Sequence, residues 1–434
     1  MVKHNLATVS LWDDLVGALA YDDKTGYCTF EYAPQWIAKG IEISPIHLPL
    51  SSRKYTFYDL PEATYKGLPG TFADTLPDDF GNAVIDAWLA REGRDKTSFT
   101  ALERLLYTGN RGMGALEYSP VTNTRLNRSS SIIELDSLVK MAQLVLDERA
   151  HLMEKITDDR EEALTAMLQV GTSAGGARPK AVIGINPERT VLRSGQVDLP
   201  EGFEHYLLKF DGVVEHSSSH QTFGDPQGYG RMEFAYYNMA KAAGINMSHC
   251  ELLEDGQRAH FMTKRFDRIG NQKLHYQSLC AMDHADYKKP GEYSYEQLFT
   301  VMRTLKLKRA EALEMFRRMV FNIVARNHDD HSKNFGFLLN SDSRWELAPA
   351  FDVAYSYRKG SPWVNSHQLS VNSQRDNFSK NDLLVVAQTF IKEAEEIIEE
   401  VTEVVSRWTS FAKDAGVFPE FTQKIQSMHR LSLT

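Results

Sequence analysis

Residues 326–334 have the sequence RNHDDHSKN, the densest polar cluster in the chain. The cluster directly follows residues 311–326, where apolar residues recur at helical spacing, so we predict a polar loop anchored by a buried helix. Phosphoryl transfer needs a carboxylate that accepts the proton of the attacking hydroxyl group, and oxygen ligands for Mg²⁺. Asp329 and Asn334 fit these roles and have the spacing of a protein-kinase catalytic loop, although the His-Arg-Asp motif of such loops is absent.

A second carboxylate follows the loop in an apolar setting. Asp352 lies eighteen residues after Asn334, within the sequence AFDV at residues 350–353. Burying a carboxylate without a partner is costly, so a bound cation is a natural explanation. Asp352 is therefore predicted as a second metal ligand, with a helix or turn cap as the structural alternative.

A glycine-rich segment, GTSAGGARPK at residues 171–180, joins a predicted helix to a predicted strand. Small residues let backbone amides approach phosphate oxygens, and Arg178 and Lys180 add positive charge beside them. The segment does not match the pattern GxxxxGK[ST] of P-loop proteins, and a flexible turn is the alternative interpretation.

Lys209 lies within an apolar strand predicted at residues 205–210. A lysine among apolar neighbours must find an anion or reach solvent. Protein kinases solve this with a phosphate and a glutamate on a helix, here Glu233. An ordinary lysine on an edge strand is the alternative.

Composition limits the classes of protein to consider. The chain has 434 residues, of which 42% are apolar and 25% charged, with a formal net charge of −9. These values are typical of a folded protein with two or three domains, and they disfavour DNA binding by this chain alone.

The three cysteines form neither a CxxC motif nor a close pair, which argues against a disulfide framework or a structural zinc site. No apolar run reaches the roughly 18 residues of a membrane span, and we expect a cytoplasmic protein without membrane contact.

Periodicity along the chain predicts an α+β protein in which a mixed part precedes a mostly helical part. The expected strands are residues 9–12, 27–32, 181–185, 205–210 and 260–266. The expected helices are residues 77–91, 231–243, 311–326, 381–394 and 396–408.

Together these pieces resemble the HipA family, bacterial Ser/Thr kinases that act as toxins in type II toxin–antitoxin systems. The resemblance covers nearly the whole chain and rests on four motifs, of which the last is the most specific. They are LPGTFADTLP at 68–77, GMGAL at 112–116, SAGGARPK at 173–180 and DDHSKNF at 329–335.

The resemblance implies a two-lobed protein-kinase-like fold, with a mixed α/β N-lobe that carries the Gly-rich loop and a mostly helical C-lobe. A small β-rich subdomain precedes the lobes. The expected boundaries are 1–125 for that subdomain, 126–268 for the N-lobe with the phosphate loop and hinge, and 269–434 for the C-lobe.

The resemblance also implies functional roles for individual residues. Asp329 is the expected catalytic base, with Lys333 also in the catalytic set, and Asn334 and Asp352 are the expected Mg²⁺ ligands. Ser173 matches a serine that family members autophosphorylate, where a phosphate would repel the phosphates of the nucleotide. The residues expected to bind ATP are those of the phosphate loop, two basic residues and the hinge: Ser173, Ala174, Gly175, Gly176, Lys180, Lys209, Lys264 and Phe266.

The same resemblance implies partners. We expect ATP and Mg²⁺ as cofactors and a protein substrate, such as an aminoacyl-tRNA synthetase or another translation component, whose phosphorylation arrests growth. We also expect a small DNA-binding antitoxin like HipB, contact with DNA only through that antitoxin, and a dimer within the toxin–antitoxin complex.

Two alternatives belong to other functional classes. His328, Asp329 and His331, together with His284 and Asp352, could instead form the site of an HD-type metal-dependent phosphohydrolase. A catalytically silent regulator that only binds an antitoxin is the second, and the presence of all three presumed catalytic side chains argues against it.

Overall fold

The computed structural model describes residues 4–91, 93, 95, 98–122, 131–147, 167–168, 178–214, 224–387 and 391–433. The chain divides into two units, and each is described by itself. The first unit comprises residues 1–43, 48–229 and 253–276, and the second comprises residues 44–47, 230–252 and 277–434.

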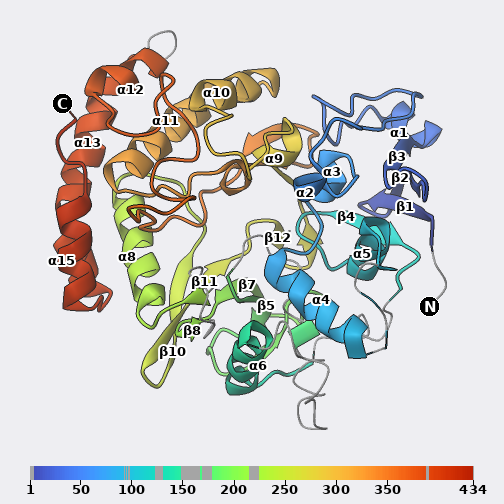
Figure 1. Ribbon diagram of the computed structural model, residues 1–434, viewed down its shortest axis with the longest axis horizontal. Coiled ribbons are helices and arrows are strands. Elements are labelled where there is room, and N and C mark those ends of the chain that lie inside the picture. Colours follow the sequence, from blue (N-terminus) through green and yellow to red (C-terminus); the bar gives the residue numbers. More distant parts are fainter. Residues whose placement is uncertain are drawn as a thin grey trace. The chain divides into compact units, whose positions relative to one another are not determined.

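A four-stranded antiparallel sheet, in the order β3-β2-β1-β4, opens the first unit (Figure 1). Its strands are β1 (Leu6–Leu11), β2 (Asp14–Tyr21), β3 (Cys28–Tyr32) and β4 (Leu116–Ser119). Trp12 and Asp13 alone connect β1 to β2, and both have positive φ, 52° and 64°, as tight hairpin turns require. The predicted strands are confirmed, except that Trp12 belongs to the turn.

The first unit also contains short helices and two longer ones, α4 and α6. They are α1 (Pro34–Lys39), α2 (Glu62–Tyr65), α3 (Gly70–Ala73), α4 (Asp79–Arg91), α5 (Ala101–Thr108) and α6 (Leu135–Asp147). The structure confirms the helix predicted up to Arg91. A capping box, in which Thr100 and Glu103 exchange side-chain and backbone hydrogen bonds, begins α5.

A second sheet of the first unit carries the predicted nucleotide-binding lysines. Its order is β10-β11-β7-β5-β6, and β5 pairs antiparallel with both β6 and β7. Every residue of β5 is buried, and Ala181, Ile183 and Ile185 share one core with apolar side chains of α4 and α6. The strands are β5 (Lys180–Ile185), β6 (Leu192–Ser194), β7 (Glu204–Lys209), β10 (Cys250–Asp255) and β11 (Arg258–Lys264). Other short strands lie outside this five-stranded sheet: β8 (Val213–Val214), β9 (Gly224–Asp225), β12 (Arg268–Ile269), β13 (Gln272–Lys273) and β14 (His275–Ser278).

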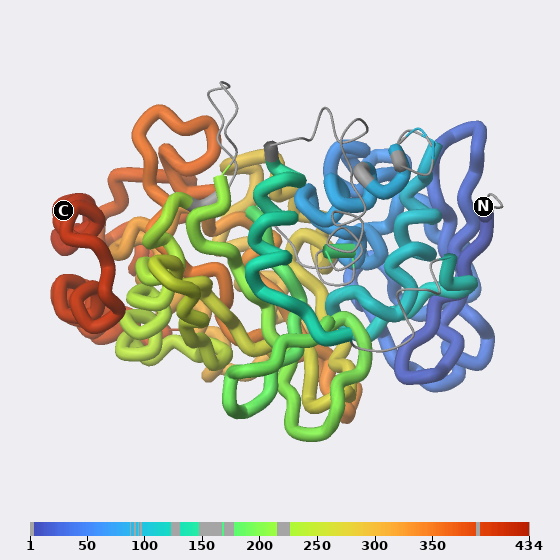
Figure 2. The backbone as a smooth tube through the Cα atoms, turned by 90° about the horizontal axis from the view of Figure 1, so that it is seen from below, coloured from blue at the N-terminus to red at the C-terminus, as the bar shows by residue number. Residues whose placement is uncertain are grey.

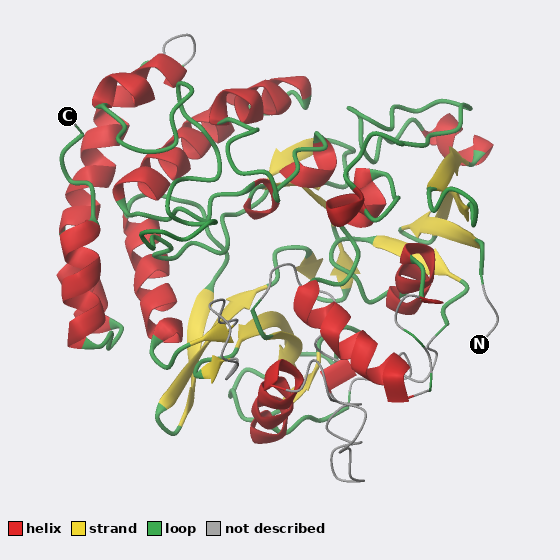
Figure 3. Cartoon of the chain, in the orientation of Figure 1, coloured by secondary structure: helices red, strands yellow, loops and turns green. Residues whose placement is uncertain are grey.

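Helices are the main regular elements of the second unit (Figure 3). They are α8 (Tyr229–Ala242), α9 (Leu279–Met282), α10 (Tyr295–Thr304), α11 (Arg309–Val324), α12 (Lys380–Ala387), α13 (Ala394–Ser406), α14 (Trp408–Asp414) and α15 (Pro419–Met428). A hairpin of β15 (Gly336–Leu339) and β16 (Trp345–Leu347) follows a 3₁₀ turn at Ser332–Asn334. The predicted helix at 311–326 is confirmed as α11. The prediction of one helix over 381–394 is wrong, because residues 391–393 are not helical and a separate helix begins at Ala394.

One buried tyrosine joins α8 to the C-terminal helices. The hydroxyl group of Tyr236 donates a hydrogen bond to the backbone oxygen of Ala325 at 2.6 Å. Its ring lies 6.2 Å from that of Phe321 and 5.2 Å from that of Trp408. Figure 2 accordingly shows α8 next to the C-terminal helices, drawn in red. Tyr236 thus links the end of α11 to Trp408 at the start of α14.

The expected α+β class, with a mixed and a mostly helical part, is confirmed by these two units. Within the described ranges, no helix is both long and apolar enough to cross a bilayer.

Candidate active site

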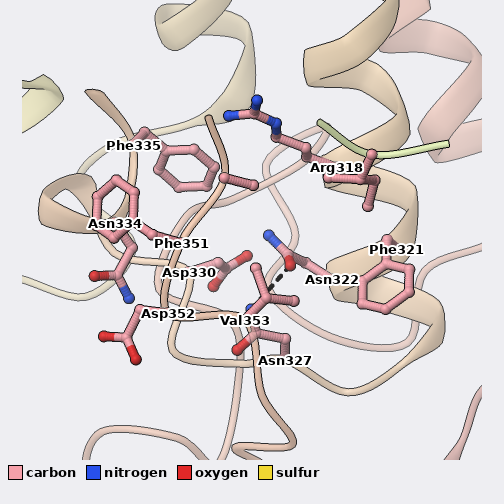
Figure 4. Close-up of a pocket in the computed structure, with 12 residues that line it drawn as sticks. Arg318, Phe321, Asn322, Asn327, Asp330, Asn334, Phe335, Phe351, Asp352 and Val353 are labelled. Carbon is pink, nitrogen blue, oxygen red and sulfur yellow. Dashed lines mark hydrogen bonds between the residues drawn. The ribbon is translucent and has the colours of Figure 1, made fainter. Parts of the chain in front are cut away.

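The polar loop of the second unit begins where α11 ends. Arg326 adopts φ of 59°, which turns the chain away from the helix axis. Asn327 is then tied back to Asn322 of α11 by two bonds: its backbone N–H donates to the backbone oxygen, and its Nδ2 donates to Oδ1, both at 2.9 Å (Figure 4). The helix therefore fixes the first residues of the loop.

Asp330 is the buried centre of the loop. Its carboxylate accepts hydrogen bonds from the hydroxyl group of Tyr295 at 2.9 Å, from Nδ1 of His367 at 2.8 Å and from the backbone N–H of Gln368 at 2.7 Å. The Asp330 and His367 side chains are fully buried. Three bonds to one buried carboxylate hold the loop, α10 and the segment after Asp352 in one arrangement.

Asp329, the predicted base, is partly exposed, unlike its buried neighbour Asp330. Its side chain is 36% exposed, and Oδ1 lies 3.8 Å from Nε2 of His331. Its backbone oxygen accepts a hydrogen bond from Nδ2 of Asn334 at 2.8 Å. Lys333, also predicted as catalytic, has its ammonium group 5.0 Å from the centre of the Tyr287 ring. The structure thus brings Asp329 and Asn334 into direct contact and leaves the Asp329 carboxylate accessible.

Asp352 lies in a segment that is fixed at both ends. The N–H of Ala350 donates to the backbone oxygen of Asn246 at 2.8 Å, and the N–H of Ser356 donates to the backbone oxygen of Arg326 at 3.1 Å. Arg318 of α11 supports the same segment by donating to the backbone oxygen of Ala348 at 3.0 Å. Asp352 has φ of 55°, a left-handed conformation that aspartate tolerates better than most residues. Such strained positions cluster at functional sites.

Asn334 and Asp352 line one pocket in the second unit, together with Asn322, Asn327 and Asp330. Figure 4 shows the polar ends of Asn334 and Asp352 on the same side of this pocket. Aromatic and aliphatic side chains form the rest of the lining: Ile245, Phe321, Phe335, Ala350, Phe351 and Val353, with Arg318 among them.

The donor atoms of these two residues fit a magnesium ion. Because Nδ2 of Asn334 is engaged by Asp329, Oδ1 is the amide atom that remains for a ligand. Asp352 adds a carboxylate, and Mg²⁺ prefers such oxygen ligands, one or two of them from the protein. In the described part of the chain, no group of three or more His, Cys, Asp or Glu residues is arranged to hold a metal ion.

In the first unit, two of the predicted nucleotide-binding lysines face each other. Lys180 of β5 and Lys209 of β7 are direct partners in the antiparallel register, and only 3% and 7% of their surfaces are exposed. Nζ of Lys180 lies 3.7 Å from Oδ2 of the buried Asp78, and Nζ of Lys209 lies 5.7 Å from the centre of the Phe261 ring. Two like charges on one face of a sheet repel each other, and the Asp78 carboxylate supplies negative charge beside this pair.

The predicted hinge residues lie on and just after β11. The ammonium group of Lys264 forms an ion pair with Glu204 on neighbouring β7, which lowers the pKa of that carboxyl group. The ring of Phe266 lies 5.5 Å from that of Tyr276. The predicted phosphate-loop residues Ser173, Ala174, Gly175 and Gly176 lie outside the described residues.

A buried charge cluster next to the hinge was not expected from the sequence. Asp267 accepts hydrogen bonds from Arg265 and Arg268, each at 2.7 Å, and from the backbone N–H of Gly114 at 2.8 Å. Arg268 also donates to the backbone oxygens of Gly112 and Gly114. The two arginines hold the pKa of Asp267 far below its usual range, although burial alone would raise it. Residues 112–116, known from the sequence only as a motif, thus contact residues 267–268, next to the predicted hinge.

Residues 428–430 also contact the start of the polar loop. Nε of Arg326 donates to the backbone oxygen of Met428 at 2.8 Å, and the backbone N–H of Arg430 donates to the backbone oxygen of Val324 at 2.9 Å. Arg430 also pairs with Asp376. These contacts fix the junction between α11 and the loop.

Two histidines of the phosphohydrolase alternative have other contacts. His328 is fully buried, its ring lies 4.1 Å from that of His367, and burial lowers its pKa far below the ordinary value. His284 stacks on His47 at 3.9 Å, and burial lowers its pKa to about 3. Both are thus engaged in packing.

Comparisons with known proteins assign both parts of the chain to the same family. The family model of the HipA N-terminal domain matches residues 7–119, and that of the HipA-like C-terminal domain matches residues 172–408. A protein of Sinorhizobium fredii described as the putative kinase Y4mE is 22% identical over 423 residues, which are 94% of this chain and 85% of that protein. A putative kinase of Haemophilus influenzae is 27% identical over 225 residues, which are 48% of this chain and only 60% of that protein.

A solved structure extends the likeness to the fold. It is a Shewanella oneidensis complex of the toxin–antitoxin proteins HipA and HipB with operator DNA. One chain of it matches with a TM-score of 0.67 and 16% identity, over 98% of this chain and 97% of that chain. The predicted two-lobed α+β fold class is thereby confirmed.

Proposed function

This chain belongs to the HipA family, and on that premise we propose that it is an ATP-dependent serine/threonine protein kinase. The observation that carries the proposal is the contact between Asn334 and Asp329, together with the pocket that Asn334 shares with Asp352. One loop then supplies both the base and a metal ligand, which is the arrangement that phosphoryl transfer needs.

Asp329 is the proposed general base. Its carboxylate is accessible, so the hydroxyl group of an acceptor can reach it and give up its proton as the oxygen attacks the γ-phosphorus. The bond from phosphorus to the β-phosphate oxygen breaks, and ADP leaves. Lys333 is proposed to offset negative charge on the transferred group.

Asn334 and Asp352 are the proposed Mg²⁺ ligands, through Oδ1 and the carboxylate. Bound Mg²⁺ would supply positive charge that offsets the negative charge building up on the phosphates during transfer. Bonds at Ala350 and Ser356 and the contact with Asp329 hold both ligands in place before metal binds.

Lys180 and Lys209 are proposed to bind the phosphates of ATP. The phosphate loop would complete the nucleotide site with Ser173, Ala174, Gly175 and Gly176, and the hinge near Lys264 and Phe266 would contact adenine. We propose Ser173 as the autophosphorylation site. We propose that the β-rich subdomain spans residues 1–125, the N-lobe residues 126–268 and the C-lobe residues 269–434.

We further propose a HipB-like DNA-binding antitoxin as partner, with DNA contacted only through it and a dimer in that complex. The complex of HipA and HipB in Shewanella oneidensis supports this proposal. A protein of the translation machinery, such as an aminoacyl-tRNA synthetase, is the proposed target.

Incubation of the purified chain with ATP labelled at the γ-phosphate, with and without Mg²⁺, tests the function. We expect Mg²⁺-dependent transfer that Asp329→Gln abolishes. Asp342→Asn, in the exposed β15–β16 turn of the same unit, is the matched control and should retain transfer. Absence of transfer by wild type, or full transfer by Asp329→Gln, would contradict the proposal. The first result would favour the silent-regulator alternative.

A further inference from the structure

An exposed loop in the second unit, residues 357–366, is attached at both ends to the proposed catalytic loop. At its start, the ring of Tyr357 lies 5.0 Å from that of His328 and 4.6 Å from the guanidinium group of Arg326. Directly after its end, His367 and Gln368 both donate to the carboxylate of Asp330. The loop therefore has a fixed position relative to Asp329.

Internal hydrogen bonds give the loop a defined shape. The N–H of Arg358 donates to the backbone oxygen of Val364 at 3.2 Å. Oγ of Ser361 accepts from the N–H groups of Trp363 and Val364, both at 3.3 Å. Gly360 has φ of 77° and its N–H donates to Oδ1 of Asn365 at 2.7 Å, so a side chain at this turn would be strained.

The loop presents one large apolar side chain and two cations to solvent. Trp363 is 46% exposed, and Arg358 and Lys359 are also exposed. The backbone oxygen of Trp363 accepts from Nε2 of Gln368, whose N–H is bound to Asp330. A chain of three direct contacts thus runs from Trp363 through Gln368 and Asp330 to Asp329.

Single exposed apolar residues are common on proteins and mean little by themselves. This tryptophan differs because its backbone is fixed and the base lies a few contacts away. Tryptophan and arginine are also the residues that most often dominate binding energy at protein interfaces. Within the described part of the chain, neither Arg358 nor Lys359 forms an ion pair.

We propose that the 357–366 loop is a docking surface for the acceptor segment of a protein substrate, and that it selects an acidic residue next to an apolar one. Trp363 binds the apolar side chain, and Arg358 and Lys359 attract the carboxylate. This inference rests on the proposed kinase function and names the class of acceptor for it.

A library of synthetic peptides, each with one serine or threonine and with varied flanking residues, tests the docking surface. Wild type should phosphorylate peptides with acidic and apolar flanks fastest. Trp363→Ala should raise the KM for the best peptide roughly tenfold or more, with a smaller change in kcat and in the KM for ATP. Trp363→Tyr, which retains an aromatic ring, should restore most of the affinity and guards against a folding defect.

Reversal of charge tests the second half of the inference. Arg358→Glu combined with Lys359→Glu should move the preference from acidic to basic flanks. The controls are Val385→Ala, which removes another exposed apolar side chain of this unit, and Lys413→Glu, an exposed lysine on α14. Both should behave as wild type.

The outcomes separate the two proposals. An unchanged peptide KM in Trp363→Ala, or an unchanged flank preference after charge reversal, overturns the docking surface and leaves the kinase function standing. Wild-type transfer to the chain itself but to no peptide in the library also overturns the docking surface. Failure to transfer phosphate to any acceptor overturns the kinase function as well.

Discussion

Lys180 and Lys209 are direct cross-strand partners on β5 and β7, and both side chains are buried. Adjacent strands place partnered side chains on the same face, so the two ammonium groups lie in one low-dielectric region. The buried Asp78 carboxylate, 3.7 Å from the ammonium group of Lys180, offsets part of this repulsion, and the proposed phosphate would add further negative charge beside the pair.

Replacing Lys209 with methionine should weaken nucleotide binding, because one of the two cations is lost. A ligand present at about 100 times its Kd stabilises a protein by about 2.7 kcal/mol, and tenfold weaker binding removes about 1.4 kcal/mol of this. The rise in Tm on addition of ATP and Mg²⁺ should therefore shrink clearly in a thermal-unfolding assay. Lys140→Met, on the exposed face of α6, should keep the full rise. An identical rise in Lys209→Met would remove the lysine from the nucleotide site.

Replacing Asp352 with asparagine should raise the Mg²⁺ concentration needed for half-maximal transfer, by about tenfold or more, because a charged ligand becomes neutral. Asparagine tolerates the left-handed φ of 55° as aspartate does, so Tm should stay close to that of wild type. Titration of activity with Mg²⁺ measures the effect. A normal Mg²⁺ requirement in this variant would favour the alternative role of Asp352 as a turn cap.

Replacing Asp330 with asparagine should destabilise the second unit. Tyr295, His367 and Gln368 all donate to this carboxylate, and an amide group cannot accept all three bonds. Breaking such a buried network costs about 3 kcal/mol. Urea unfolding should show the loss, and Asp342→Asn on the surface should not. If Asp330→Asn unfolds like wild type, the network has no structural role.

Stability should fall as the pH drops from about 7 towards about 4.5. Burial lowers the pKa of several histidines below the ordinary value of 6.5: to about 4 for His205 and His275, and to about 3 for His284 and His429. These histidines stay neutral in the folded protein and regain an ordinary pKa when it unfolds. The unfolded chain then binds more protons below about pH 6.5, and the free energy of unfolding decreases.

Replacing one of these histidines tests whether it causes part of the fall in stability at low pH. His275 is fully buried and its Nε2 contacts the backbone oxygen of Ile43 at 3.0 Å, a bond that glutamine can also make. Below about pH 6.5, His275→Gln should reduce the change in the free energy of unfolding with pH by roughly 1.4 kcal/mol per pH unit. His249→Gln, at an exposed position, is the control. Unfolding midpoints in a pH series give the slopes, and equal slopes for His275→Gln and wild type would contradict the assignment.

The sequence was sufficient for elements with a strong local pattern. The helical spacing of residues 311–326 predicted α11, and the polar residues after it predicted the loop that carries Asp329 and Asn334. Predictions failed where a boundary depended on tertiary contacts. The single helix expected at 381–394 is interrupted, and Trp12 leaves its strand for a two-residue turn.

Contacts between distant residues could not be predicted from local patterns. Asp330 and His367 are 37 positions apart, and nothing in either neighbourhood indicates that they meet. The opposition of Lys180 and Lys209 depends on strand register, which periodicity alone does not give. The cluster of Asp267 with Gly114 joins segments 153 positions apart.

The contacts made by Met428 and Arg430 affect the order in which this protein matures on the ribosome. Arg326 and Val324 precede Asp329 in synthesis, but their partners Met428 and Arg430 are added more than a hundred positions later. A nascent chain that has already synthesised residues 327–334 still lacks the contacts that fix the start of this loop. Translation through residue 430 is therefore a condition for a fully supported loop, and a polypeptide that stalls before residue 428 is released without that support.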